Sequence, residues 1–205
     1  MAFSLVEGTF AALIFDCDGT LVDSAPAHLH SIRQALKPLG LTMTDDWYHP
    51  RHGLGPHPLI DEYEAEFNLP PIDRDAFFER NNAAFQASIA LIEEITFVAD
   101  IARAWHGRVP MSVASNGVRE NVEATLVSTN LRPLFDHVVT ADDVKHGKPA
   151  PDVYLEAARR MEVDPAQCIV FEDSDEGLEA AHRAGMRGID IRKEAAVATT
   201  SGDNS

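Results

Sequence analysis

The chain has 205 residues, 45% of them hydrophobic, and a formal net charge of −16. This length fits one domain, or a core domain with a smaller insert, and the apolar content argues against a disordered chain or a disulfide scaffold. An acidic surface repels phosphate backbones, so we expect no nucleic-acid partner. Any site for an anionic substrate has to be locally positive.

The cysteines are few and no targeting segment is evident. Cys17 and Cys168 are the two cysteines of the chain, too few for a disulfide framework. The first residues show no basic region followed by a long apolar run, and no run of about 18 apolar residues occurs, so neither a signal peptide nor a membrane span is predicted. We therefore expect a cytoplasmic monomer without a membrane partner.

The first part of the chain combines one strand with a helical segment. Residues 11–15 are a short apolar run that stops at Asp16, which indicates a buried strand. From about residue 25 to residue 90 the pattern is helical without a convincing strand. The helices predicted there span 26–39, 58–67 and 74–90. Residues 47–58 hold three prolines and two glycines, so we expect a loop.

After residue 90, apolar runs alternate with helical patterns. The predicted strands span 111–114, 138–140, 168–171 and 188–191, and the predicted helices span 97–105, 118–126, 151–161 and 174–184. This alternation predicts a parallel sheet covered on both faces.

The expected fold is therefore α/β, with a Rossmann-like parallel sheet and a small all-helical cap inserted after the first strand. We expect a core of residues 1–24 and 91–192, a cap of residues 25–90 and a disordered tail at 193–205. An insert at this point lies over the carboxyl edge of the sheet, where α/β proteins bind ligands, and is a candidate lid.

Acidic residues follow two of the predicted strands. Asp16 and Asp18 come directly after the first strand, in the segment Asp-Cys-Asp-Gly-Thr that ends at Thr20, and Glu172 and Asp173 follow the strand at 168–171. Buried carboxylates are costly unless they are paired, hydrogen-bonded or bound to a metal, and oxygen ligands of this kind suit Mg²⁺. One carboxylate can attack phosphorus and the other can protonate a leaving group. An ordinary Asp-Gly turn and an N-cap are the alternative readings.

Two further motifs follow strands or turns. Ser115-Asn116-Gly117 offers a hydroxyl and amides that can cradle phosphate oxygens. Lys148 is followed by proline in the Gly-Lys-Pro segment, which makes it a fixed cation that can neutralise charge on a phosphoryl group. Either segment alone is also typical of a solvated turn.

The order Asp-x-Asp-Gly-Thr, Ser-Asn-Gly, Gly-Lys-Pro and Glu-Asp-Ser resembles the haloacid dehalogenase-like superfamily, in the branch that includes β-phosphoglucomutase and many sugar phosphatases. The resemblance covers residues 10–191. Three shorter segments resemble fructose-1-phosphatase and 6-phosphogluconate phosphatase-like proteins. They are Trp105-His106-Gly107-Arg108, Val144-Lys145-His146 and Arg160-Met161.

The resemblance implies a Mg²⁺-dependent phosphatase that acts on a small phosphate ester, a sugar phosphate, through an aspartyl-phosphate. It implies Asp16 as nucleophile, Asp18 as general acid and then base, and Lys148 as the catalytic cation. The phosphate would be bound by Thr20, Ser115, Asn116 and Lys148. The metal would be held by Asp16, Asp18 through its carbonyl, Glu172 and Asp173.

Two alternatives stay open. A β-phosphoglucomutase-type enzyme needs a cap arginine after a glycine, where this chain has Pro56, although Arg51 lies nearby and His28 matches a histidine that positions the acid-base aspartate in the mutase. A non-catalytic binding module on the same fold is the second alternative. The cap loop also carries His49, His52 and His57, for which substrate contact or simple solvation is favoured over a zinc site.

Overall fold

The computed structural model describes residues 6, 8–51 and 54–193. It divides into two compact units, a core unit of Met1–Asp23 with Glu93–Ser205 and a helical unit of Ser24–Ile92. The tail predicted to be disordered lies, from residue 194, outside the described residues.

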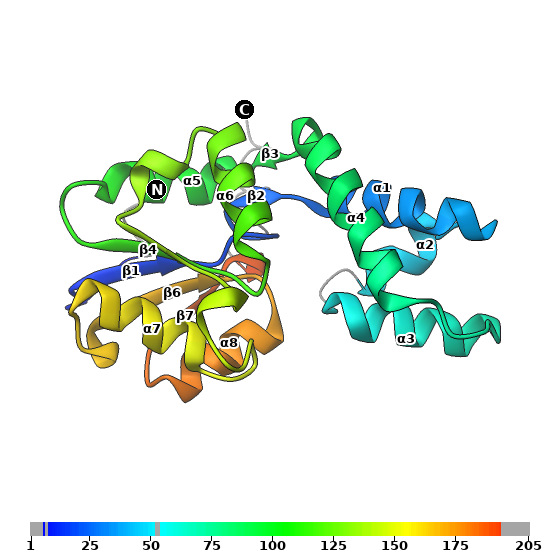
Figure 1. Ribbon diagram of the computed structural model, residues 1–205. Helices are drawn as coiled ribbons and strands as arrows, with labels where there is room; N and C mark the ends of the chain where they lie inside the picture. Colours follow the sequence, from blue (N-terminus) through cyan, green and yellow to red (C-terminus); the bar gives the residue numbers. More distant parts are fainter. Residues whose placement is uncertain (1–5, 7, 52–53, 194–205) are drawn as a thin grey trace, which may run out of the picture. The chain divides into compact units, whose positions relative to one another are not determined.

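The core unit is built on a five-stranded sheet in the order β5-β4-β1-β6-β7 (Figure 1). All four neighbouring pairs are parallel. The strands are β1 (Ala12–Phe15), β4 (Met111–Ala114), β5 (His137–Val139), β6 (Cys168–Glu172) and β7 (Arg187–Asp190). The three inner strands are buried at every residue, as expected for a sheet covered on both faces.

Helices cover both faces of this sheet. Figure 1 shows α5 (Thr96–Trp105) and α6 (Arg119–Ser128) on one face, and α7 (Asp152–Met161) and α8 (Asp175–Arg183) on the other. The α7 and α8 side of the core joins apolar residues of both helices to those of the strands, including Val153, Tyr154, Ala181 and Val170. Short 3₁₀ turns complete the unit: η4 (Arg132–Leu134), η5 (Ala141–Asp143) and η6 (Pro165–Gln167).

The helical unit contains α1 (Ala25–Leu36), α2 (Asp45–Tyr48), α3 (Pro56–Phe67) and α4 (Arg74–Ser88), with 3₁₀ turns η1 (Lys37–Leu39), η2 (His49–Arg51) and η3 (Ile89–Leu91). Its core is apolar and aromatic, with Leu29, Leu36, Trp47, Tyr63 and Phe77 buried together. The α/β core and the helical unit confirm the predicted fold class.

Four arginines of the helical unit are bonded to backbone carbonyls within that unit. The bonds run from Arg33 to Met43 (2.7 Å), from Arg51 to Trp47 (3.0 Å), from Arg74 to Ile72 (2.9 Å) and from Arg80 to Ala35 (3.1 Å). These guanidinium groups therefore connect the helices to the segments beside them.

The prediction of a loop over residues 47–58 is wrong at both ends. Trp47 and Tyr48 are the last residues of helix α2. This helix starts at Asp45, because the Thr44 hydroxyl accepts a hydrogen bond from the Trp47 amide (3.3 Å) and caps its first turn. Helix α3 begins at Pro56, since proline is well accommodated in a first helical turn. Pro50 therefore lies in the short turn η2, and Pro56 and Pro58 lie in the first turn of α3.

A second, two-stranded antiparallel sheet was not predicted. It pairs β2 (Val22–Asp23) with β3 (Glu93–Glu94), so that Asp23 lies opposite Glu93 where the chain leaves and re-enters the core unit. Two-residue strands carry no periodic signal in the sequence. Among the described residues, none of the helices combines the length and apolar character that crossing a membrane requires.

Candidate active site

The predicted motifs of the core unit meet at the carboxyl edge of its sheet. Asp16 follows β1, Ser115 follows β4 and Glu172 ends β6. The register pairs Phe15 with Phe171, so Asp16 and Glu172 emerge side by side, and the Asp16 amide donates to the Phe171 carbonyl at 3.0 Å. The topology therefore brings together groups that lie more than 150 residues apart in the chain.

Lys148 is buried between two carboxylates. Its Nζ donates to Asp16 Oδ1 at 2.6 Å and to Glu172 Oε1 at 2.7 Å, and its side chain is 4% exposed. Burial opposes the charged form, but the negative charges of Asp16 and Glu172 outweigh it and hold the pKa of Lys148 well above its usual value. Lys148 is therefore a protonated cation fixed at the sheet edge.

Glu172 is surrounded by donors. Its Oε1 accepts from Lys148 Nζ and from the Tyr154 hydroxyl (3.0 Å). Its Oε2 accepts from the amides of Asp173 (2.9 Å) and Ser174 (2.8 Å) and from the Ser174 hydroxyl (2.9 Å). Burial raises the pKa of Glu172, but Lys148 and the Ser174 hydrogen bonds more than offset this and lower it. Glu172 is therefore an ionised group that holds its neighbours in place.

Asp16, Glu172 and Asp173 form an acidic cluster, with one carboxylate oxygen of each within 4.8 Å of the others. Burial, and then the neighbouring Glu172 charge, raises the pKa of Asp173, whose Oδ1 accepts from the Thr20 hydroxyl at 3.1 Å. Gly19 has φ +86°, and a Cβ there would lie 2.2 Å from Asp173 Oδ2. A glycine at this position therefore allows the first motif to approach Asp173 closely.

The Asn116 side chain binds the backbone of Lys148. Its Oδ1 accepts from the Lys148 amide at 2.8 Å, and its Nδ2 donates to the Lys148 carbonyl at 3.3 Å. The Ser115 hydroxyl accepts from the Gly117 amide at 2.9 Å. A Cβ on Gly117 would lie 3.7 Å from Asp18 Oδ2, so the Asp18 carboxylate lies beside this turn.

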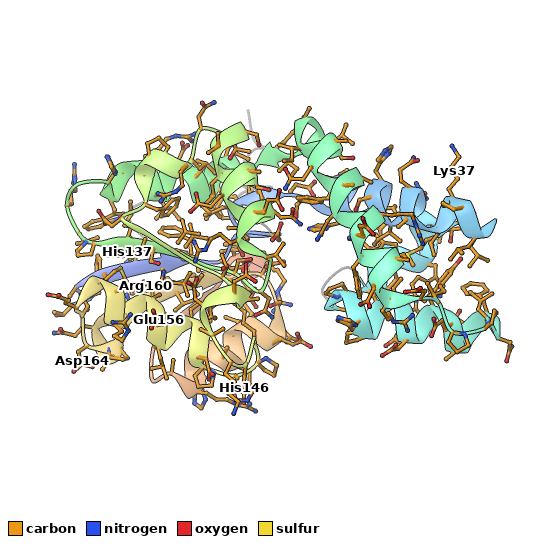
Figure 2. The ribbon with its side chains drawn as sticks, viewed as in Figure 1. Lys37, His137, His146, Glu156, Arg160 and Asp164 are labelled. Atoms are coloured by element: carbon orange, nitrogen blue, oxygen red, sulfur yellow. The ribbon has the colours of Figure 1, made fainter. Side chains whose placement is uncertain are left out.

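The loop that carries Lys148 is anchored at its start. The Thr140 amide donates to Asp143 Oδ2 at 2.8 Å, and Asp143 also pairs with Arg119 and, at 2.8 Å, with Arg160. Arg160 in turn pairs with Glu156 on the preceding turn of α7 at 2.7 Å (Figure 2). Helix α7 and this loop are thereby held to each other.

Two residues beside Glu172, Tyr154 and Gly177, were missed by sequence reasoning, whereas Gly147 belongs to the Gly-Lys-Pro motif identified from the sequence. Tyr154 contacts Glu172, and Gly147 and Gly177 lie against Asn116 and Glu172. The sequence signal of Tyr154 is that of an apolar position on α7, and the signal of Gly177 is that of an ordinary helix start. Nothing in a single sequence separates these residues from packing.

The histidines of the predicted site belong to the helical unit. The His28 ring on α1 stacks on Phe85 of α4 with centroids 4.5 Å apart. His49 and His57 are exposed, and the His57 ring packs edge-on against Phe78 at 4.4 Å. His52 lies outside the described residues, so the histidine cluster stays a prediction.

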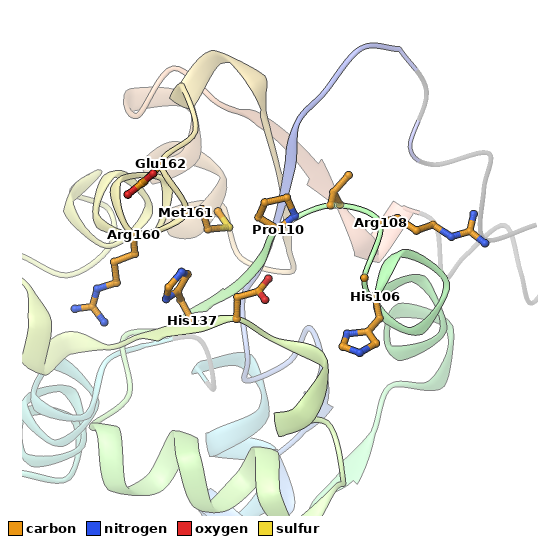
Figure 3. A pocket seen from close by; sticks show the side chains of 10 residues that line it. His106, Arg108, Pro110, His137, Arg160, Met161 and Glu162 are labelled. Atoms are coloured by element: carbon orange, nitrogen blue, oxygen red, sulfur yellow. The ribbon is translucent and has the colours of Figure 1, made fainter.

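A surface pocket of about 470 Å³ lies at the opposite edge of the sheet, near the first residues of β4 and β5 (Figure 3). Its lining includes two segments that the sequence analysis singled out, His106-Gly107-Arg108 and Arg160-Met161. Asp136 and Glu162 also line it, so its charges are mixed, and none of the predicted site residues does so.

Comparison with known proteins identifies the family. The model of the haloacid dehalogenase-like hydrolases matches residues 13–191. The chain is 39% identical to fructose-1-phosphate phosphatase YqaB of Escherichia coli strain K12, over 89% of this chain and 97% of that protein. It is 29% identical to a phosphorylated carbohydrates phosphatase of Thermotoga maritima, covering 87% of this chain and 83% of that one.

The solved structures agree on the fold. CbbY from Rhodobacter sphaeroides in complex with phosphate superposes with a TM-score of 0.78 at 26% identity, covering 88% of this chain and 85% of CbbY. With the family model matching nearly the whole described chain and the four motifs gathered at one sheet edge, the protein belongs to the haloacid dehalogenase-like hydrolases.

Proposed function

We propose that this protein is a Mg²⁺-dependent phosphatase that hydrolyses a small sugar phosphate resembling fructose 1-phosphate. The observation that carries the proposal is the contact between Asp16 and Lys148, 2.6 Å long and buried at the carboxyl edge of the sheet. A carboxylate beside a fixed cation suits attack on a phosphorus atom whose oxygens the cation stabilises. The E. coli and Thermotoga phosphatases support the substrate class.

In the proposed reaction, an oxygen of Asp16 attacks phosphorus and the bond from phosphorus to the sugar oxygen breaks. Asp18 donates a proton to that leaving oxygen. The Asp18 carboxylate then takes a proton from water, whose oxygen attacks the aspartyl-phosphate and releases inorganic phosphate from Asp16. Lys148 and the Ser115 turn bind the phosphoryl oxygens.

The acidic cluster fits a divalent cation. One ammonium, Lys148, faces the carboxylates of Asp16, Glu172 and Asp173, and burial raises the pKa of Asp16 well above its usual value, with Lys148 opposing this and the other two carboxylates adding to it. Asp16, Asp173 and the Asp18 carbonyl would hold Mg²⁺, with Glu172 beside them. When bound, Mg²⁺ supplies charge that favours the ionised nucleophile and stabilises the phosphoryl oxygens.

The helical unit supports a phosphatase over a mutase. A mutase carries a phosphate-binding arginine where this chain has Pro56, and Arg51 lies five residues before that position in the sequence. Its guanidinium donates to the Trp47 carbonyl, pairs with Glu62 and Glu66 (both 3.1 Å) and lies 4.3 Å from the centre of the Trp47 ring. Arg51 is thus engaged inside its own unit. We propose that the helical unit acts as a lid for a substrate with one phosphate.

The test is release of inorganic phosphate from a panel of sugar phosphates, with Mg²⁺ or with EDTA. We expect release that needs Mg²⁺ and falls at least about 10³-fold in Asp16→Asn, because the nucleophile is lost. Asp46→Asn, the same change at an exposed site on α2, should keep wild-type rates. Isomerisation of β-glucose 1-phosphate with a bisphosphate, without phosphate release, would identify a mutase instead.

A binding measurement tests the metal without turnover. Mg²⁺ alone should raise the melting temperature of the wild-type protein, because a ligand that binds the folded state stabilises it. Asp173→Asn removes one carboxylate of the cluster and should reduce that shift. An equal shift in both proteins would place the cation elsewhere.

A further inference from the structure

The ammonium of Lys148 is supported by a tyrosine that no motif includes. Tyr154 is fully buried, its hydroxyl donates to Glu172 Oε1 at 3.0 Å, and Lys148 Nζ lies 4.9 Å from the centre of its ring. The same Oε1 accepts from Lys148 Nζ. Tyr154 thus fixes the oxygen that orients the lysine. Asp16 and Glu172 accept from two of the three N–H groups of this ammonium, whose third N–H points to neither carboxylate in these two bonds.

The backbone of Lys148 is held by a second, separate contact. Asn116 accepts from the Lys148 amide and donates to its carbonyl, so one side-chain amide binds both polar groups of one residue. Gly147 makes this approach possible, since a Cβ there would lie 2.7 Å from Asn116 Oδ1. These two bonds use the Asn116 Oδ1 and one of the two N–H groups of its Nδ2.

We propose that Tyr154 and Asn116 are positioning residues that place Lys148 against the phosphoryl group, Tyr154 through Glu172 and Asn116 through the lysine backbone. The inference rests on the proposed phosphatase activity.

The first test is Tyr154→Phe, which removes the hydroxyl and keeps the ring. We expect kcat to fall roughly tenfold with KM little changed, since a lysine that stabilises developing charge acts mainly in the transition state. Tyr63→Phe is the matched control, because its buried hydroxyl donates to the Thr42 carbonyl at 2.7 Å inside the helical unit. It should change stability without changing kcat.

A Lys148→Ala background separates positioning from a general structural effect. If Tyr154 acts through Lys148, Tyr154→Phe causes no further loss once the lysine is absent. Losses that multiply in the double variant would overturn the role of Tyr154.

The second test uses Gly147→Ala and Asn116→Ala. The added methyl at 147 should displace the Asn116 amide and lower kcat roughly tenfold, but have little effect when Asn116 is already alanine. Independent, multiplying losses would overturn the role of Asn116. The two tests rely on different elements, so failure of one variant to fold leaves the other in force.

Wild-type phosphate release and its loss in Asp16→Asn are measured first, so the two proposals can fail separately. An active enzyme with unchanged kcat in Tyr154→Phe and Gly147→Ala overturns only the positioning. If the wild-type protein releases no phosphate, the phosphatase proposal fails. Affinity for orthovanadate, an analogue of the phosphoryl-transfer transition state, measured by calorimetry with Mg²⁺ present, then decides the positioning: we expect about tenfold weaker binding in Tyr154→Phe, and equal binding would overturn it.

Discussion

Gly177→Ala should disrupt the site by displacing the Glu172 carboxylate, without replacing any group that touches a substrate. Gly177 lies in the first turn of α8, and an alanine Cβ there would lie 1.8 Å from Glu172 Oε1, 2.0 Å from its Cδ and 2.5 Å from its Oε2. Ordinary contacts begin near 3.4 Å, so Glu172 has to move by roughly 1.6 Å. Hydrogen bonds do not survive such a displacement.

The size of the effect follows from the bonds that are lost. Oε1 accepts from Lys148 and Tyr154, and a hydrogen bond to a charged group contributes about 1.5–3 kcal/mol. Glu172 is fully buried, so water cannot replace these donors. The better helix propensity of alanine offsets about 0.5–1 kcal/mol. We therefore expect Gly177→Ala to lower the free energy of unfolding by about 2–5 kcal/mol.

Urea unfolding followed by circular dichroism measures this loss, and phosphate release on the same preparation should show a reduced kcat. Gly55→Ala is the control, because the nearest atom to a Cβ there is Pro58 Cδ at an ordinary 3.8 Å. A Gly177→Ala protein within about 0.5 kcal/mol of wild type, with normal kcat, would refute the argument that Glu172 is tightly confined.

Two further predictions concern ion pairs outside the site. The Arg159 hydrogen bond, followed by that of Arg160, lowers the pKa of Glu156 from 4.5 to about 2. The ionised Glu156 therefore stabilises the folded state fully above pH 4.5, and this stabilisation is lost as pH falls toward 2. The difference in unfolding free energy between wild type and Glu156→Gln should shrink over this range. Arg74 binds Glu64 through both nitrogens, so Arg74→Lys should cost about 1 kcal/mol in urea unfolding, whereas Arg183→Lys, at an exposed helix pair, should cost almost nothing. Equal losses of unfolding free energy in urea for the two lysine variants would contradict the special role of the contact through two nitrogens.

The sequence was informative where a charged residue stands at a position that packing in an apolar core does not explain. Asp16, Glu172 and Lys148 stand at the ends of apolar runs or in a constrained turn, and such polar residues are hard to explain by a core alone, so their convergence could be predicted. The parallel sheet could be predicted from the alternation of runs and helices. Both predictions use signals that a few adjacent residues carry.

Other parts of the site have no such signal. Tyr154 is one more apolar position on α7 until its hydroxyl is seen to reach Glu172. The resemblance predicts Asn116 as a phosphate ligand, which stays a prediction, but its bonds to the Lys148 backbone, 32 residues away, have no signal in the sequence. Contacts of this kind join residues that are far apart in the chain, and the residues next to each partner in the sequence give no sign of them.

The paired strands β2 and β3 have a consequence for how this chain can change. They hold Asp23 and Glu93 opposite each other in an antiparallel pair, so the chain leaves and returns to the core at neighbouring points. Opposed residues in such a pair are about 5 Å apart, a gap that a tight hairpin can close. The helical unit is therefore an insertion that can be replaced by a segment of another length, or removed, at the β2–β3 pair. Such a change would not alter the register of the five parallel strands.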